Sequence, residues 1–203
     1  MLVKLYDDNI NTKDLESVVD VLKKDGVIVY PTDSVYAIGC SILSIKAVQH
    51  VARLKGLDPK KSSFSIICSD LSMAASYAKI SNNIFKAMKN NLPGPFTFIL
   101  PASGKLPNIM LNKRRTVGIR IPDNYIAKSI VEELGSPIIT TSVGKDDLYD
   151  EYMTDPDLIH EKYESLVDMV IDGGIGNMDV SAVLDCTDEG IEIIREGIKE
   201  FNY

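Results

Sequence analysis

The chain has 203 residues, of which 45% are hydrophobic, and a formal net charge of −7 at pH 7. That length predicts one domain spanning residues 1–203, and the acidic balance argues against a nucleic-acid binder that works by bulk charge, although it is compatible with a local basic cleft. No apolar run approaches the roughly 20 residues that span a bilayer, and acidic residues stand where a secretory signal would be apolar, so we expect a soluble cytoplasmic protein that does not enter membranes.

Apolar residues recur at helical spacing in several segments, which predicts a series of packing helices. The first covers residues 13–24. The second covers residues 44–55, with Ser44 as its cap and Ile45, Val48 and Ala52 facing inward. The others are a short helix capped by Ser69-Asp70 that ends at Tyr77, one capped by Ser81 with Ile84, Phe85 and Met88 on one side, one capped by Asp123 or Asn124 that ends at Leu134, and one capped near Thr154.

Short β-branched and aromatic runs predict the strands of the same domain. They cover residues 26–30, 62–68, 96–100, 116–122, 138–142, 167–171, 181–185 and 191–195. Some are joined by helices and others by short turns, which favours an α/β fold with a twisted, mixed parallel and antiparallel sheet and helices on its faces. No repeat or linker divides the motif-bearing part, about residues 12–197.

The segment from Gly26 to Cys40, GVIVYPTDSVYAIGC, organises the rest of the chain. Its apolar first half predicts a strand buried on both faces, which Pro31 ends. Polar groups at Thr32, Asp33, Ser34 and Tyr36 follow before Gly39 ends the segment, and α/β sheets bind ligands at such strand ends. The alternative is a polar turn that satisfies its own backbone.

Other patterns argue against a metal held by the protein. Cys40, Cys68 and Cys186 stand far apart, which favours buried free thiols. The only histidines, His50 and His160, exclude most histidine-rich sites, and the acidic residues between 146 and 157 lack the spacing of a calcium loop. The glycine-rich residues 172–176 lack a phosphate-binding fingerprint and indicate a flexible turn.

Polar or charged side chains mark the ends of several predicted strands. Hydroxyl groups stand at Thr32, Ser34, Thr140, Thr141, Ser142 and Ser181, late arginines at Arg120 and Arg195, and Lys55 at a helix end. If these converge, they supply hydrogen-bond donors and three cations without a nucleophile–base pair, which suits an anionic ligand. Chemistry would then come from positioning and charge neutralisation, as in adenylyl transfer. Two alternatives stay open: Lys55 as a partner of the helix dipole, and the basic residues 113–115 as a solvated surface strip.

Six short motifs, in order along the chain, resemble those of one family. They are YPTDSVYAIG, LPGPFTFIL, TVGIRIP, TTSVG, SAVLDCT and IIREG. The first is similar to the YPT(D/E)(T/S)-x-Y-(G/A)-(L/I)-G signature of the YrdC-like family, and the other five are similar to its later motifs. The resemblance runs from about Gly26 to Gly197.

The resemblance implies a YrdC-like fold with a large positive concave cleft. It also implies condensation of L-threonine, bicarbonate and ATP, with Mg²⁺ on the nucleotide, to L-threonylcarbamoyl-AMP and pyrophosphate for tRNA modification. By motif position, it implies that Thr32, Arg120, Thr140 and Ser181 hold threonine with Ser34 and Tyr36 beside them, and that Lys55, Thr116, Ser142 and Arg195 hold ATP. Family members are also described as binding double-stranded RNA or tRNA.

Two positions depart from the synthase pattern. Where synthases carry K-x-R and S-x-N, this chain has Lys55-Gly56-Leu57 and Ser142-Val143-Gly144. SSFSIICSDL, MKNNLPGPFTFIL and VDMVIDGG instead resemble the YciO-type branch of the family, which lacks the same two residues. Two functions are therefore predicted as alternatives: a weak or specialised L-threonylcarbamoyl-AMP synthase, and a non-catalytic module that binds nucleotide, tRNA or double-stranded RNA in the same cleft.

Overall fold

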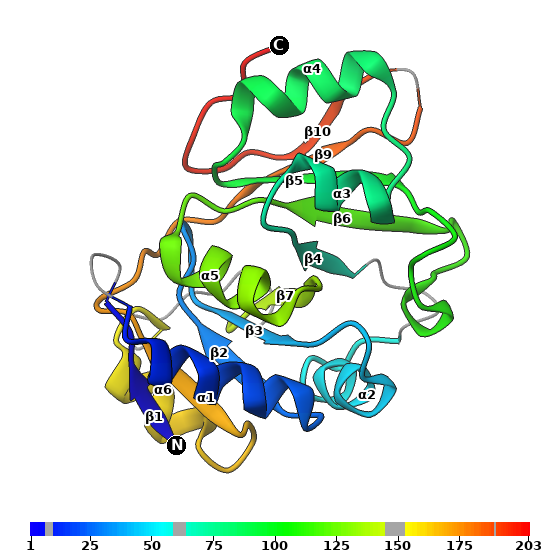
Figure 1. Cartoon of the computed structure of the whole chain (residues 1–203). Helices are drawn as coiled ribbons and strands as arrows, with labels where there is room; N and C mark the ends of the chain where they lie inside the picture. Colours follow the sequence, from blue (N-terminus) through cyan, green and yellow to red (C-terminus); the bar gives the residue numbers. More distant parts are fainter. Residues whose placement is uncertain (7–9, 59–63, 145–152, 189) are drawn as a thin grey trace.

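The protein, described by a computed structural model over residues 1–6, 10–58, 64–144, 153–188 and 190–203, is built around a ten-stranded sheet (Figure 1). The strands are β1 (Leu2–Lys4), β2 (Val27–Tyr30), β3 (Ala37–Cys40), β4 (Ser65–Ile67), β5 (Phe96–Pro101), β6 (Thr116–Arg120), β7 (Ile138–Ser142), β8 (Met169–Asp172), β9 (Ala182–Asp185) and β10 (Glu192–Arg195). Their order across the sheet is β1-β8-β2-β3-β7-β4-β6-β5-β9-β10. The first and last strands of the chain therefore form the two edges.

The sheet mixes both strand directions, as the sequence predicted. The pairs β1–β8, β2–β8, β4–β6 and β5–β9 are parallel. The pairs β2–β3, β3–β7, β4–β7, β5–β6 and β9–β10 are antiparallel. The predicted mixed α/β sheet is confirmed.

Helices connect most of the strands and cover the sheet. They are α1 (Thr12–Lys23), α2 (Ile45–Leu54), α3 (Leu71–Tyr77), α4 (Asn82–Asn91), the 3₁₀ helix η1 (Asn108–Met110), α5 (Tyr125–Leu134) and α6 (Pro156–Tyr163). Side chains of Ser44, Asp70, Ser81 and Asn124 accept hydrogen bonds from first-turn backbone amides, which confirms the predicted caps. Within the described part of the chain, no helix is both long enough and apolar enough to cross a bilayer.

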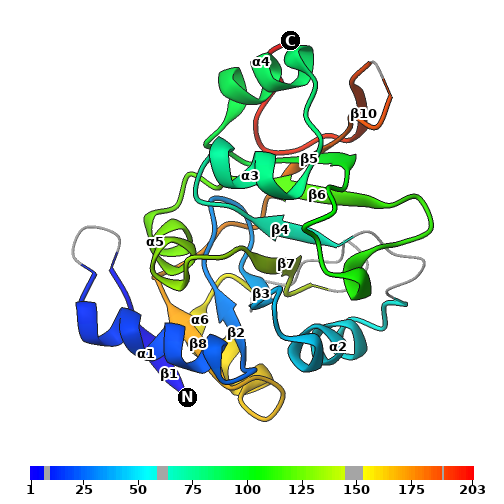
Figure 2. The same cartoon turned by 45° about the vertical axis from the view of Figure 1, so that its right-hand side comes forward.

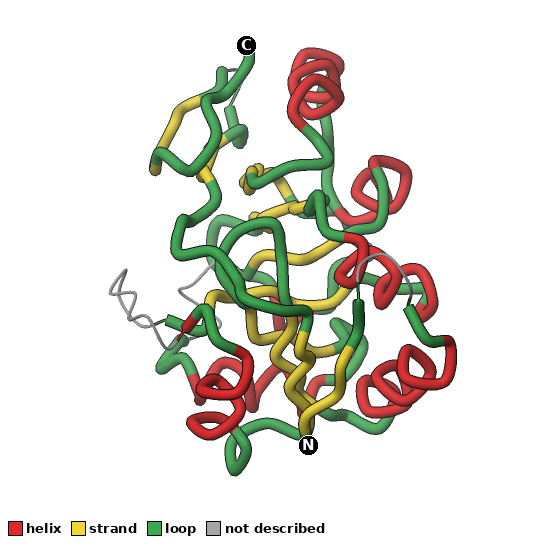
Figure 3. The backbone as a smooth tube through the Cα atoms, turned by 90° about the vertical axis from the view of Figure 1, so that its left-hand side faces the viewer, coloured by secondary structure: helices red, strands yellow, loops and turns green. Residues whose placement is uncertain are grey.

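Side chains alternate along the strands between one face of the sheet that packs in the core and a second face that is polar. Figure 2 shows α3 in front of β5 and β6, α4 above β5 and α5 to the left of β4, and the side view in Figure 3 shows most helices on one side of the strands. Val117 and Ile119 of β6 are buried in the hydrophobic core that includes residues of α3 and α4. Successive strand residues point to opposite faces, so Gly118 and Arg120 face away from this core. The functional site lies on that second face.

Strands β1 and β3 were not predicted. The sequence indicated that Gly39 ends the central motif, whereas β3 pairs antiparallel with β2 along its whole length, from Ala37 opposite Tyr30 to Cys40 opposite Val27. Gly39 lacks a side chain because a Cβ there would lie 2.7 Å from Cε1 of Tyr30. This glycine therefore marks a close approach inside a strand and not the end of a segment.

Two residues predicted to face inward do not. Ile45 is 60% exposed and Phe85 is 42% exposed. Ile45 is the first residue of α2, whose packed face begins at Ala47 and Val48, while α4 turns Ile84 and Met88 inward and leaves Phe85 at its side. Helix α6 is capped by Asp155, next to Thr154, where the sequence predicted a cap. The predicted acidic residues 146–151 and the first two residues of the predicted strand at 62–68 lie outside the described residues.

Candidate functional site

Six of the predicted site residues line one cavity of about 280 Å³. They are Ser34, Arg120, Thr140, Ser142, Ser181 and Arg195. We call this space the central cavity. Its walls come from the strands that neighbour one another from β3 through β7, β4, β6, β5 and β9 to β10. The predicted convergence of strand-end hydroxyls with two arginines is therefore observed, although their roles in binding stay predictions.

The floor of the central cavity needs a glycine in β6. Ser65, Thr97 and Gly118 all line the cavity from adjacent strands. A Cβ at position 118 would lie 3.0 Å from the Cβ of Ser65 and 3.1 Å from Cγ2 of Thr97. Such contacts are tighter than side chains tolerate, so the absence of a side chain at Gly118 lets the two neighbouring polar residues close over β6.

Arg120 is held by a buried ion pair. Its Nη2 atom donates to Oδ1 of Asp33 at 2.8 Å and to Oγ of Ser34 at 3.1 Å. The Asp33 and Arg120 side chains are only 7% and 8% exposed. The second carboxylate oxygen of Asp33 accepts from the backbone N–H of Asp123 at 2.9 Å, which fixes the carboxylate in turn. Arg120 therefore has a fixed direction, and its charge is balanced within the protein.

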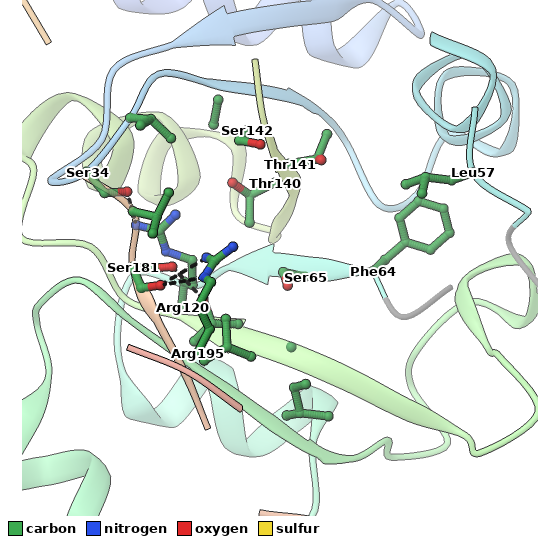
Figure 4. A pocket seen from close by; sticks show the side chains of 17 residues that line it. Ser34, Leu57, Phe64, Ser65, Arg120, Thr140, Thr141, Ser142, Ser181 and Arg195 are labelled. Carbon is green, nitrogen blue, oxygen red and sulfur yellow. Dashed lines mark hydrogen bonds between the residues drawn. The ribbon is translucent and has the colours of Figure 1, made fainter. Parts of the chain in front are cut away.

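Arg195 is fixed to Ser181, the residue before β9. Its Nε and Nη2 atoms donate to the backbone carbonyl of Ser181 at 3.2 and 2.9 Å. The hydroxyls of Ser181 and Thr97 lie 3.1 Å apart. Figure 4 shows Arg120 and Arg195 at the same end of the cavity, with Ser34 and Ser181 beside them. Two guanidinium groups and several hydroxyls thus face a volume suited to a small anionic ligand.

Lys55 is not one of the described residues that line the central cavity, but it contacts Ser142, which does line it. It follows α2 as the C-cap residue. Its Nζ atom donates to the backbone carbonyl of Ser142 at 2.8 Å and to that of Gly144. The ammonium group therefore joins the end of α2 to the turn that follows β7. The sequence analysis had kept open that Lys55 is only a partner of the helix dipole.

Three other predicted site residues, Thr32, Tyr36 and Thr116, are not among the described residues that line the cavity. Thr32 Oγ1 donates to the carbonyl of Val35 at 2.8 Å and accepts from the N–H of Ser34 at 3.1 Å. The Tyr36 hydroxyl donates to the carbonyl of Gly174 at 2.6 Å. Thr116 Oγ1 accepts from Nδ2 of Asn112 at 3.0 Å. The Thr32 contacts match the polar turn that the sequence analysis kept as an alternative.

Some buried polar atoms near this site have no hydrogen-bond partner among the described residues. One of them is Nε of Arg120, whereas the hydroxyls of Tyr30 and Thr140 lie close enough to interact with each other. Burial raises the pKa of Tyr30 well above its usual range, so its hydroxyl stays protonated. Unpaired buried polar groups are costly in a packed protein and are enriched where a ligand or water completes the hydrogen bonding.

Sequence reasoning missed several residues of the site. Asp33 was noted only as a polar residue after a strand, and its pairing with Arg120 joins residues 87 positions apart. Ser65, Thr97 and Gly118 were read as parts of strands. Their signal was present, because a polar residue or a glycine inside an otherwise apolar strand suggests a face turned toward a ligand or another backbone.

Comparisons with known proteins identify the family of this chain. Residues 20–197 match the Sua5/YciO/YrdC family, described as "Telomere recombination". The chain is 38% identical to the YciO protein of Escherichia coli over 198 residues, covering 96% of this chain and 94% of that one. It is 32% identical over 124 residues to a threonylcarbamoyl-AMP synthase of Thiobacillus denitrificans, covering 61% of this chain and 66% of the synthase.

Solved structures show the same fold. The crystal structure of E. coli YciO superposes with a TM-score of 0.92 at 35% identity, covering 98% of this chain and 97% of that one. The structure of P. abyssi Sua5 complexed with L-threonine superposes with a TM-score of 0.86 at 23% identity, covering 97% of this chain and 57% of that one. The matched segment, the motif order and the shared fold together show that this chain belongs to the Sua5/YciO/YrdC family.

Proposed function

We propose that the chain binds a nucleotide in the central cavity and condenses L-threonine, bicarbonate and ATP to L-threonylcarbamoyl-AMP, releasing pyrophosphate and water. The product is the activated intermediate of threonylcarbamoyladenosine formation in tRNA. Membership of a family that includes threonylcarbamoyl-AMP synthases supports this reaction class. The sequence departures at Leu57 and Gly144 suggest that this activity is weak or specialised in the present chain.

The observation that carries the proposal is the convergence of Arg120 and Arg195 in one cavity. A non-specific polyanion binder would spread its cations along a groove to follow a phosphate backbone. Here two guanidinium groups share a space of about 280 Å³ with the hydroxyls of Ser34, Thr140 and Ser181. That arrangement suits compact anionic groups held close together, such as a carboxylate and a nucleotide phosphate.

The roles of the residues follow from their chemistry. Arg120, held in direction by Asp33, would bind the threonine carboxylate, with Thr140 and Ser181 donating further hydrogen bonds. Thr32 would support this site through the turn that it stabilises. Arg195 and Ser142 would bind the nucleotide. Lys55, which donates to the Ser142 carbonyl, and Thr116 would support them. Neither histidine is among the described residues that line the cavity. Rate acceleration would therefore come from positioning and charge neutralisation.

The described walls do not supply a magnesium site. Mg²⁺ binds carboxylate, phosphate and water oxygens, and none of the described lining residues carries a carboxylate. The Asp33 carboxylate already accepts from Arg120 and from the Asp123 backbone. Any magnesium would have to be held by the phosphates of the nucleotide and by water, and no step of the proposal depends on a protein ligand to it.

A second candidate function is binding of tRNA or double-stranded RNA without catalysis. Lys113, Arg114 and Arg115 are exposed, and the Arg114 side chain is 79% exposed with only a long contact of 3.8 Å to Asp185. Exposed basic side chains can contact phosphates of a backbone. In this reading the central cavity would bind a nucleotide of the RNA or none.

Calorimetry with ATP and L-threonine, followed by assays of pyrophosphate and L-threonylcarbamoyl-AMP with bicarbonate present, tests the proposal. We expect binding of both ligands, and product only when all three substrates are supplied. Pyrophosphate release that does not depend on threonine would indicate simple ATP hydrolysis and contradict the proposed reaction. Binding of RNA with no response to ATP or threonine would favour the second candidate.

A further inference from the structure

We propose that Ser65 binds the carboxyl group that bicarbonate brings to the reaction, by donating a hydrogen bond from its hydroxyl to one oxygen of that group. This inference rests on the proposed function, since it assumes that the central cavity condenses threonine, bicarbonate and ATP. It goes further by giving the third substrate a residue of its own, because Arg120 and Ser142 are assigned to the other two.

Ser65 lies in the middle of the cavity floor. It belongs to β4, which has β7 on one side and β6 on the other, and it stands opposite Thr140 of β7 and Gly118 of β6. Residues that stand opposite each other in adjacent strands turn to the same face of the sheet. These three residues therefore form one row across the cavity, and all three line it. Figure 4 shows Ser65 between Arg120 and Phe64.

The directions of the three strands place Ser65 between the positions assigned to threonine and to the nucleotide. Arg120 follows Gly118 by two residues on β6 and faces the same side of the sheet. Ser142 follows Thr140 by two residues on β7 and does the same. Because β4 is parallel to β6 and antiparallel to β7, Arg120 and Ser142 lie on opposite sides of the row. Each is roughly 7 Å along its strand from the row.

The glycine in β6 leaves the hydroxyl of Ser65 facing the cavity. The two atoms nearest to a Cβ at position 118 would be Oγ and Cβ of Ser65. Ser65 thus occupies the space over β6 that another side chain would fill, and it stays half-buried. The hydroxyls of Thr97 and Ser181 lie 3.1 Å apart and pair with each other, whereas Ser65 makes no hydrogen bond through its hydroxyl to another described residue. Its hydroxyl is therefore open to a ligand.

The group that forms between threonine and the nucleotide comes from bicarbonate. The amino nitrogen of threonine attacks the bicarbonate carbon, so that a C–N bond forms, a C–O bond breaks, and water leaves with a proton from the amine. An oxygen of the resulting carbamate then attacks the α-phosphorus of ATP, an O–P bond forms, and the bond to the bridging oxygen breaks as pyrophosphate leaves. With threonine held at Arg120 and the nucleotide at Ser142, these atoms lie over the middle of the floor, beside Ser65.

A serine hydroxyl suits this task, because it donates one hydrogen bond and its oxygen has two acceptor lone pairs. It donates to an oxygen of bicarbonate, and it stabilises the negative charge that develops there while the amine attacks the carbon. A hydrogen bond to a charged oxygen is stronger than one between neutral groups. Loss of the hydroxyl should therefore weaken the use of bicarbonate and leave the binding of the other two substrates as it was.

Three substitutions at Ser65 test this role. Ser65→Thr keeps the hydroxyl, Ser65→Val replaces it by a methyl group on a side chain of the same shape, and Ser65→Ala removes it. Bicarbonate is added in steps to depleted buffer with threonine and ATP, and pyrophosphate and L-threonylcarbamoyl-AMP are measured. We expect Ser65→Val and Ser65→Ala to raise the KM for bicarbonate about tenfold or more, and Ser65→Thr to remain near the unmodified protein. Calorimetric dissociation constants for threonine and ATP should be unchanged, and circular dichroism checks folding.

The outcomes separate the inference from the proposed function. An equal KM for bicarbonate in Ser65→Thr and Ser65→Val would mean that Ser65 acts through packing, and it would overturn the inference while leaving the synthase intact. Weaker binding of threonine or ATP in Ser65→Ala, by the same factor as the rise in KM, would assign the hydroxyl to those ligands and also overturn it. Absence of product with the unmodified protein would overturn the proposed function and the inference with it.

Discussion

Lys55 and Ser142, 87 residues apart in the sequence, are joined by a hydrogen bond of 2.8 Å from Nζ to the backbone carbonyl. The same ammonium donates to the carbonyl of Gly144. The end of α2 is thereby connected to the turn that follows β7. This contact gives Lys55 a structural task at a position that the family resemblance assigns to ATP binding, and the two roles predict different results on substitution.

Replacing Lys55 by methionine should destabilise the protein. We expect Lys55→Met to lower the free energy of unfolding by about 1.5–3 kcal/mol, the range for a hydrogen bond to a charged group. Lys46→Met, at an exposed lysine of the same helix, is the control and should have little effect. Urea denaturation measures both. An unchanged stability together with a large loss of ATP affinity would show that Lys55 leaves the carbonyls to bind phosphate.

The ion pair between Asp33 and Arg120 makes a second prediction. Asp33→Asn should lower the free energy of unfolding by about 3–5 kcal/mol, because it leaves the Arg120 charge buried without a counter-charge. The double variant Asp33→Asn/Arg120→Met removes both charges and should recover much of that loss. Denaturant titration of the three proteins tests this. Equal destabilisation in the single and double variants would mean that the pair acts only through packing.

The sequence predicted the framework of this site better than its internal contacts. Strand-end hydroxyls and arginines are local signals, so the convergence of Thr140, Ser181, Arg120 and Arg195 followed from recognising an α/β sheet. The Asp33–Arg120 pair and the contact of Lys55 with Ser142 were not predictable, because each joins segments 87 residues apart and depends on how the strands are ordered.

The missed strands have a similar explanation. β1 has three residues and forms by parallel pairing with β8, far along the chain. β3 contains a glycine, a residue that weakens strand propensity, and it is stabilised by pairing with both β2 and β7. Tertiary pairing decided these two elements, whereas local hydrophobic pattern was sufficient for β5, β6 and β7.

Arg195 provides a direct test of the nucleotide site. Arg195→Ala should abolish nucleotide binding without unfolding the protein, because this residue ends an edge strand and is not part of the core. Arg114→Ala removes the same charge from a side chain that is 79% exposed and is the control. Calorimetry with AMP and ATP, with circular dichroism as the check on folding, measures the effect. Unchanged nucleotide affinity in Arg195→Ala would refute the assignment.

The buried thiols predict that the free energy of unfolding falls at alkaline pH. Burial raises the pKa of Cys40 and of Cys186 from 9.0 to about 12. The folded protein keeps these thiols neutral while the unfolded chain ionises above pH 9, so their contribution to stability is complete below pH 9 and is lost as the pH rises toward 12. The loss should approach about 1.4 kcal/mol per pH unit for Cys40 and be smaller for Cys186.

Urea denaturation between pH 7 and pH 11 measures this dependence, using pH values on either side of the thiol pKa of the unfolded chain, about 8.5–9. Cys40→Ala should reduce the alkaline slope relative to the unmodified protein. A second measurement is alkylation of the thiols by iodoacetamide at pH 8. We expect it to be slow in the folded protein and rapid after unfolding. Fast alkylation of the folded protein would contradict the burial of these groups.

Restoring the synthase pattern tests how far the two departures limit activity. The double variant Leu57→Arg/Gly144→Asn should increase pyrophosphate release with threonine, bicarbonate and ATP, because it adds a guanidinium and an amide beside groups that are already in place. Each added contact could contribute about 1.5–3 kcal/mol, which corresponds to tenfold or more in rate or affinity. Asparagine is the residue that the synthase pattern S-x-N carries at the position of Gly144.

The single variants separate the two contributions. Leu57→Arg alone should improve ATP binding, whereas Gly144→Asn alone should act on the turn whose carbonyl Lys55 contacts. The turn at Gly144 is buried, so thermal melting of each variant must first establish that the fold is retained. A folded double variant that binds ATP more tightly but releases no more pyrophosphate would show that ATP binding is separable from catalysis. It would favour a binding role for this chain.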